Sequence, residues 1–165
     1  MAKGGRDPEY YDEPTNSVGF LARITFRSFA RALEKRTMTK GVTIGQWRFL
    51  RVLWAEDGLT QRELSRRVGL REPTTVTALK SLERSELVTR AQSEEDRRRV
   101  HVFLTPKAKR LRRTLTPFVA DVNRIATAGV CEADLEVMRR VLMKVNENLR
   151  VNNGDSAPIA DETSL

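Results

Sequence analysis

Apolar residues recur every three or four positions over much of the chain, which is the spacing of one face of an α-helix. In residues 16–37 they are Val18, Ala22, Phe26, Phe29 and Leu33. The same spacing predicts further helices at about 43–57, 60–68, 73–86, 106–128 and 132–150. The chain is therefore expected to be mainly helical.

Several of these segments begin with residues that stabilise helix starts. Thr43 with Gln46, and Thr60 with Glu63, fit the capping-box pattern, in which both side chains bond to free backbone N–H groups. Pro73 stands where the first turn of a helix tolerates proline. These signals predict three successive helix starts between residues 43 and 73.

The hydrophobic pattern changes between residues 87 and 104. Residues 87–90 and 100–104 are rich in β-branched and apolar side chains, which is typical of strands, and the segment between them is polar and charged. This predicts a β-hairpin with a long basic tip. The order helix, helix, tight turn at Gly69, helix and basic hairpin is that of a winged helix-turn-helix.

The predicted fold class is mainly α with a small β-hairpin wing (α+β). We expect a flexible N-terminal arm at 1–15, a dimerisation helix at 16–42, the winged helix-turn-helix domain at 43–105, dimerisation helices at 106–150 and a disordered tail at 151–165.

The last two predicted helices carry apolar seams with heptad-like spacing. The residues of these seams that we expect at a homodimer interface are Leu111, Phe118, Leu135, Leu142 and Leu149. Seams of this kind suit helix–helix packing. Each is short, so packing within one chain is an alternative interpretation.

The positive charge is concentrated in the middle of the chain. Residues 61–113 contain 15 of the 30 Lys and Arg but only 7 of the 22 Asp and Glu, so this segment accounts for the net charge of +8. A localised positive field indicates a polyanionic partner. Together with the predicted fold, it favours double-stranded DNA.

Other classes of protein lack support in the sequence. The single Cys131 and the single His101 lie in different predicted elements, so neither a zinc cluster nor a Cys–His nucleophile pair is indicated. No Gly-rich phosphate loop, signal peptide or membrane-spanning apolar stretch is evident. We expect a cytoplasmic protein that is not an enzyme and has no metal, cofactor or membrane partner.

Candidate DNA contacts lie in two places. The helix at 73–86 is expected to present polar residues near its start to base edges in the major groove; these are Arg71, Glu72, Thr74, Thr75, Thr77 and Lys80. At the hairpin tip the candidates are Asp96, Arg97 and Arg98, because arginine suits the narrow, electronegative minor groove. A solvated charged loop is the alternative interpretation of this tip.

The sequence resembles the multiple antibiotic resistance regulator (MarR) family over about residues 18–150. The motifs that carry the resemblance are Thr43–Leu50, Leu59–Leu64 with Gly69-Leu70, Thr75-Val76-Thr77-x-x-Lys80-x-Leu82-Glu83, Leu87-Val88-x-Arg90, and Asp96-Arg97-Arg98 leading to Val102–Thr105. The last motif is the most specific.

The resemblance implies a dimer that binds a pseudo-palindromic operator, usually as a repressor released by a small ligand. It also implies that Arg98 enters the minor groove while Asp96 orients the wing. Ala108 departs from the family, which often has glycine there. The N-terminal cysteine of oxidation-sensing members is absent, which argues against that mechanism.

The resemblance further implies a ligand site between the dimer helices and the winged domain. Candidate residues are Arg23, Phe26, Arg27, Trp47 and Arg51, because an apolar wall with a few cations suits an aromatic ring bearing a carboxylate. The expected effector is a phenolic acid or its coenzyme A thioester. Plain core packing with a solvated arginine face is the alternative for these residues, and a ligand-independent architectural DNA-binding protein is the alternative function.

Overall fold

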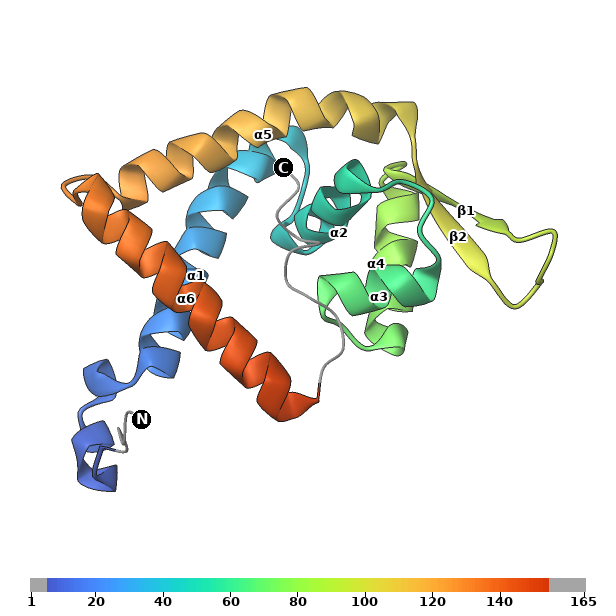
Figure 1. Ribbon diagram of the computed structural model, residues 1–165. Coiled ribbons are helices and arrows are strands. Elements are labelled where there is room, and N and C mark those ends of the chain that lie inside the picture. The colour runs from blue at the N-terminus through green and yellow to red at the C-terminus, as the bar shows by residue number, and fades with distance from the viewer. Residues whose placement is uncertain (1–5, 155–165) are drawn as a thin grey trace.

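The computed structural model describes residues 6–154, and its elements follow the predicted order. The α-helices are α1 (Val18–Thr37), α2 (Ile44–Ala55), α3 (Gln61–Val68), α4 (Glu72–Arg84), α5 (Pro106–Ala126) and α6 (Glu132–Asn153). The strands β1 (Val88–Gln92) and β2 (Val100–Leu104) lie between α4 and α5 and form an antiparallel hairpin (Figure 1). The predicted fold class, mainly helical with a small β-hairpin wing, is confirmed.

Both predicted capping boxes are present. The Gln46 N–H donates to the Thr43 hydroxyl at 3.2 Å, and the Thr43 N–H donates to Gln46 Oε1 at 3.1 Å. The Glu63 N–H likewise donates to the Thr60 hydroxyl at 3.2 Å, and the Thr60 N–H donates to Glu63 Oε2 at 2.9 Å. These reciprocal bonds satisfy backbone groups that a helix start would leave unpaired, and they fix where α2 and α3 begin.

The hydrophobic core lies around α2. Its fully buried side chains come from α2, α3, α4, the hairpin and the first half of α5; among them are Phe49, Leu50, Leu53, Leu64, Leu79, Leu82, Leu87, Val102 and Leu115. Trp54 adds a directed contact, because its indole N–H donates to the Ala108 carbonyl at 3.0 Å. The core thus joins the winged domain to the start of α5.

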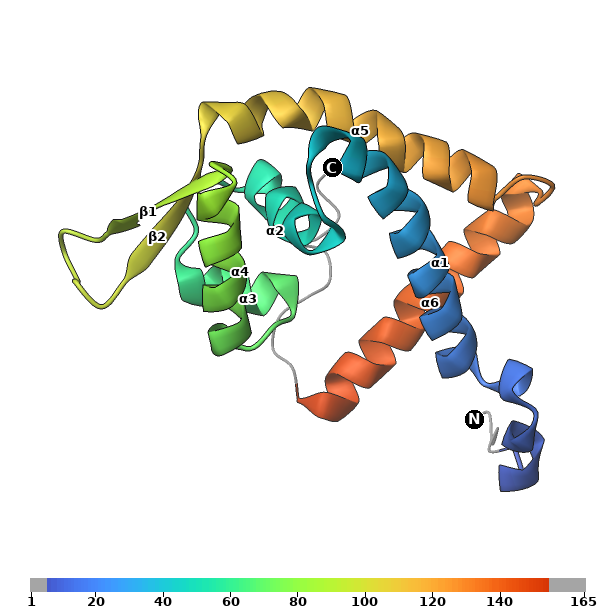
Figure 2. The ribbon, with the colours of Figure 1, turned by 180° about the vertical axis from the view of Figure 1, so that it is seen from behind.

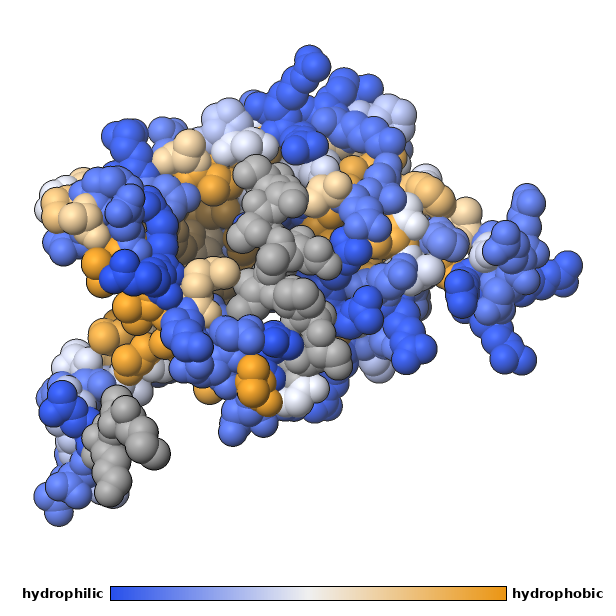
Figure 3. Space-filling model, viewed as in Figure 1, coloured by the Kyte–Doolittle hydropathy of each residue, from blue (hydrophilic) through white to orange (hydrophobic). Residues whose placement is uncertain are grey.

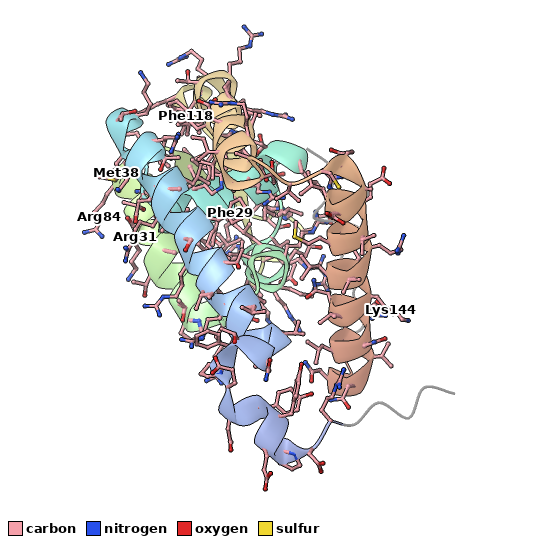
Figure 4. All side chains as sticks on the ribbon, turned by 90° about the vertical axis from the view of Figure 1, so that its left-hand side faces the viewer. Phe29, Arg31, Met38, Arg84, Phe118 and Lys144 are labelled. Atoms are coloured by element: carbon pink, nitrogen blue, oxygen red, sulfur yellow. The ribbon has the colours of Figure 1, made fainter. Side chains whose placement is uncertain are left out.

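The remaining helices extend beyond this core. In Figures 1 and 2, α5 runs from the hairpin across the molecule, α1 runs down from it, and α6 turns back from its far end. Only Leu135 is buried along α6. Figure 4 shows this helix standing apart from α1, with the Lys144 side chain pointing outward.

The structure corrects two of the predicted boundaries. Part of the arm predicted as flexible forms two short 3-10 helices, Pro8–Asp12 and Pro14–Asn16, each begun by a proline whose ring fixes φ. At the other end, α6 continues to Asn153, so the first three residues of the predicted disordered tail are helical. Residues 1–5 and 155–165 lie outside the described part of the chain.

Candidate nucleic-acid interface and ligand pocket

One side of α4 presents polar side chains to solvent. Arg71, at the N-cap, and Glu72, Thr74, Thr77 and Lys80 are all exposed. The opposite side of α4 carries Leu79 and Leu82, which are fully buried in the core. The core contacts therefore fix which side of this helix is available to a duplex.

Thr75 is an exception among the predicted contacts. It is 0% exposed, and its hydroxyl has no hydrogen-bond partner among the described residues. Thr75 precedes the buried Leu79 and Leu82 by four and seven positions, so it shares their face of the helix. In this structure the prediction that Thr75 reaches a base edge is wrong.

A polar groove of about 1080 Å³ separates the start of the helix-turn-helix from the wing. It brings together four of the predicted DNA contacts, Arg71, Glu72, Asp96 and Arg98, from segments far apart in sequence. Three further arginines line it: Arg62, Arg66 and Arg99. These three were not predicted as site residues, although they lie within the basic segment at 61–113.

Asp96 organises the tip of the wing. Its Oδ1 accepts the Arg98 N–H at 3.0 Å, its carbonyl accepts the Arg99 N–H at 2.8 Å, and its Oδ2 lies 3.5 Å from Arg99 Nε. Gln92 donates from its amide to the Arg97 carbonyl at 2.6 Å. The backbone of the tip is thus fixed, while the Arg97 and Arg98 side chains are exposed.

An ion pair joins the wing to α4. The Arg90 guanidinium of β1 binds the Glu83 carboxylate of α4 with two bonds, Nε to Oε1 at 2.9 Å and Nη2 to Oε2 at 2.6 Å. These bonds raise the pKa of Arg90 above its ordinary value. Gln46 links α2 to the same helix, since its amide donates to the Ser85 hydroxyl at 2.9 Å.

A second pocket, of about 690 Å³, lies where α1, α2, the end of α3 and α5 meet. Its apolar wall includes Phe26, Phe29, Leu33, Ile44, Trp47, Val52, Val68, Val119 and Val122, and its cations are Arg48, Arg51 and Arg67. Figure 3 shows an apolar, hollowed surface below α5.

The pocket contains only some of the predicted ligand residues. Phe26, Trp47 and Arg51 line it, whereas Arg23 and Arg27 do not. Arg23 instead packs over the Phe20 ring, 5.3 Å from its centroid. Figure 4 shows Phe29 and Arg31 on opposite sides of α1.

The five predicted interface residues divide into two groups. Leu111 and Phe118 are partly buried against the core of their own chain, and Leu135 is 7% exposed. Leu142 and Leu149 on α6 are 40% and 55% exposed. The other exposed large apolar residues of α6 are Val137, Met138, Val141, Met143 and Val151, and of these Met138, four positions before Leu142, shares its face of the helix.

The described residues contain neither a candidate metal site nor a candidate membrane span. Within 6–154, no group of three or more His, Cys, Asp or Glu residues is arranged to hold a metal ion. No helix in this range is long and apolar enough to cross a membrane.

The sequence and the fold both match known regulators. The sequence model of the MarR family matches residues 42–100. The HTH-type transcriptional regulator TtmR of Methylorubrum extorquens is 34% identical over 113 residues, which are 68% of this chain but 56% of TtmR.

Among solved structures, the transcriptional regulator PA3341 is 33% identical with a TM-score of 0.71, over 81% of this chain and 98% of that one. A MarR transcriptional regulator from Methanosarcina mazei Go1 is 26% identical with a TM-score of 0.73, over 81% and 97% of the two chains. All three relatives are described as transcriptional regulators.

Proposed function

This chain belongs to the MarR family of DNA-binding transcriptional regulators, and we propose that it acts as a homodimeric repressor released from its operator by a small anionic aromatic compound. The observation that carries the ligand-dependent part is the position of the 690 Å³ pocket. It is bounded by α3, the helix that directly precedes the turn into α4. A ligand there would contact the DNA-reading unit itself.

We propose that α4 enters the major groove and the wing follows the adjacent minor groove. The exposed Thr74, Thr77 and Lys80 would then meet base edges or phosphates, and Arg98 would enter the minor groove. The hydrogen-bonded backbone of the wing tip supports this proposal, because less backbone entropy is lost when Arg98 binds.

The chemistry of the pocket supports an aromatic acid. An apolar wall with three guanidinium groups suits a ring that bears a carboxylate, and the volume lies in the usual range for small-molecule sites. Of the two effector classes, the free phenolic acid fits this volume better. The coenzyme A part of a thioester would have to extend beyond it.

The dimer is proposed on the basis of α6. An exposed apolar stripe that includes Leu142 and Leu149 is costly to leave in water, and a second copy of the chain would cover it. One helix-turn-helix per chain then gives two recognition helices. Their half-sites on the operator would lie about one helical turn apart.

The test is release of a preformed complex. The operator is selected by the protein from a random duplex library, and phenolic acids and their thioesters are then titrated against the complex at fixed salt. We expect Trp47→Ala to raise the effector concentration needed for release and Arg23→Ala, outside the pocket, to leave it unchanged. The absence of release by any compound of either class would remove the ligand-dependent part of the proposal.

DNA-binding measurements also distinguish the proposed repressor from the alternative function, an architectural DNA-binding protein. An architectural DNA-binding protein would bind selected and random duplexes with similar affinity and would ignore every ligand. A repressor prefers the selected duplex by orders of magnitude. Competition between the two duplexes at one salt concentration distinguishes the cases.

A further inference from the structure

We propose that Arg67 is the anion receptor of the pocket, and that the effector's carboxylate displaces Glu56 from it. This inference rests on the proposed function, since it assigns how the ligand site controls DNA binding. The geometry points to an exchange of partners at one guanidinium, rather than to simple filling of an apolar cavity.

Arg67 is the one pocket arginine that belongs to the helix-turn-helix. It lies in the last turn of α3, next to Val68, and both residues line the pocket. The other two pocket arginines, Arg48 and Arg51, are on α2. Arg48 also packs over the Phe26 ring, at 5.8 Å from its centroid.

The Arg67 side chain is largely removed from water and already holds an anion. It is 22% exposed, and its Nη1 donates to Glu56 Oε2 at 2.7 Å. A guanidinium that is partly withdrawn from water is stabilised by a negatively charged partner, because it has lost part of its hydration. Glu56 is 57% exposed, so it regains hydration when released. A carboxylate bound inside the pocket can take its place.

Glu56 begins the segment that anchors the wing. It is the C-cap residue of α2, and the next residues bond to β2. Asp57 Oδ1 accepts the Leu104 N–H at 2.7 Å, and the Gly58 N–H donates to the Val102 carbonyl at 3.1 Å. Movement of residue 56 is therefore transmitted directly to the second strand of the wing.

Arg67 is connected to α4 through a short turn. Val68 and Gly69 follow it, and the left-handed turn at Gly69 leads straight into α4. One ion pair thus ties the helix that positions α4 to the segment that positions the wing. The two must keep a fixed separation to meet adjacent grooves of one duplex. Loss of the pair should therefore weaken DNA binding.

The first test requires no effector. We expect Glu56→Gln and Arg67→Gln each to weaken binding to the selected operator about 3- to 10-fold, and the double variant to be no weaker than either single one, because all three lack the same pair. The matched control is Glu132→Gln, which removes a similar ion pair with Arg139, at 2.8 Å on α6, and leaves the pocket intact. Thermal unfolding at one protein concentration checks that each variant is folded.

The second test measures the anion itself. Binding of 4-hydroxybenzoate to the DNA-free protein is followed through tryptophan fluorescence, since Trp47 lines the pocket. We expect Glu56→Gln to bind this probe about 3- to 10-fold more tightly, because the competing carboxylate is gone, and Arg67→Gln to lose binding. Hydrogen exchange at the Gly58 and Leu104 amides should quicken in Glu56→Gln and when the probe binds the wild-type protein.

The outcomes separate this inference from the proposed function. Operator affinity of Glu56→Gln within twofold of the wild type would overturn the coupling. Equal binding of 4-hydroxybenzoate by Arg67→Gln and the wild type, or no saturable binding by either, would overturn the receptor assignment. A third outcome is that no phenolic acid or thioester releases the operator, while Glu56→Gln still weakens operator binding. That result would remove the proposed effector class and leave the coupling between Arg67 and Glu56 in place.

Discussion

Replacement of Thr75 by valine should stabilise the protein without changing its affinity for DNA. The Thr75 hydroxyl is fully buried and has no hydrogen-bond partner among the described residues. Burying a hydroxyl without a partner costs roughly 1–3 kcal/mol in protein mutational data. Valine has nearly the same shape and a similar helix propensity, so Thr75→Val removes this cost without leaving a cavity.

The expected gain in the free energy of unfolding is about 1–2 kcal/mol, because part of the penalty is relieved by small movements of the surrounding side chains. For a chain of this length, that corresponds to a rise in Tm of about 2–8 °C. Urea unfolding and calorimetry at one fixed protein concentration measure it, since a dimer makes Tm depend on concentration.

The exposed neighbour Thr77 provides the matched control. Thr77→Val removes a hydroxyl that donates to the Pro73 carbonyl at 3.2 Å on the outer face of α4, so we expect stability within about 0.5 kcal/mol of the wild type. If Thr77 contacts the operator, this variant weakens DNA binding and Thr75→Val does not. Destabilisation by Thr75→Val, or a loss of operator affinity confined to that variant, would refute the reasoning.

Three further expectations follow from the site and from the helices. Arg98→Ala should reduce operator affinity by roughly 1–3 kcal/mol, measured by fluorescence anisotropy at fixed salt, whereas Arg113→Ala on the exposed side of α5 should have little effect. Placing arginine at Leu142 or Leu149 should shift the protein from dimer to monomer in analytical ultracentrifugation, because an unpaired charge cannot be buried in an apolar interface. Bonds from the Thr60 hydroxyl and N–H lower the pKa of Glu63 below its ordinary value of 4.5. The ionised Glu63 therefore stabilises the fold at pH values above 4.5, and this stabilisation is lost as the pH falls through the lowered pKa. Glu63→Gln should make the free energy of unfolding depend less on pH between pH 6 and pH 3.

The features that the sequence predicted best are those with local causes. Both capping boxes involve residues three positions apart, and their bonds form as soon as the helix starts. The change from helical spacing to β-branched strands at residue 87 is equally local. The hairpin tip lies between these cases: Asp96 and Arg98 were assigned through the family resemblance, and the bonds of Asp96 explain how so charged a loop holds one conformation.

Features that depend on tertiary packing were predicted less well, and α4 shows why. Its threonines at 74, 75 and 77 are chemically alike, so composition assigns all of them to the polar face. Their directions are fixed by Leu79 and Leu82, whose spacing from Thr75 places it inside. A helical phase taken from the leucines, rather than from polarity, would have separated Thr75 from its neighbours.

The ligand pocket was harder still to predict from the sequence. Glu56, the C-cap of α2, and Arg67, in α3, are eleven positions apart, and no periodicity connects them; they meet only because the core packs α2 against α3. Trp47 could be found because it lies on the apolar face of α2 and is 5% exposed, and Phe26 lines the pocket although its own side chain is 57% exposed. A long arginine beside them can turn either way, since its stem packs on apolar surface while its charge seeks an anion or water. Arg67 lines the pocket and also bonds to Glu56, whereas Arg23 and Arg27 on α1 do not line the pocket.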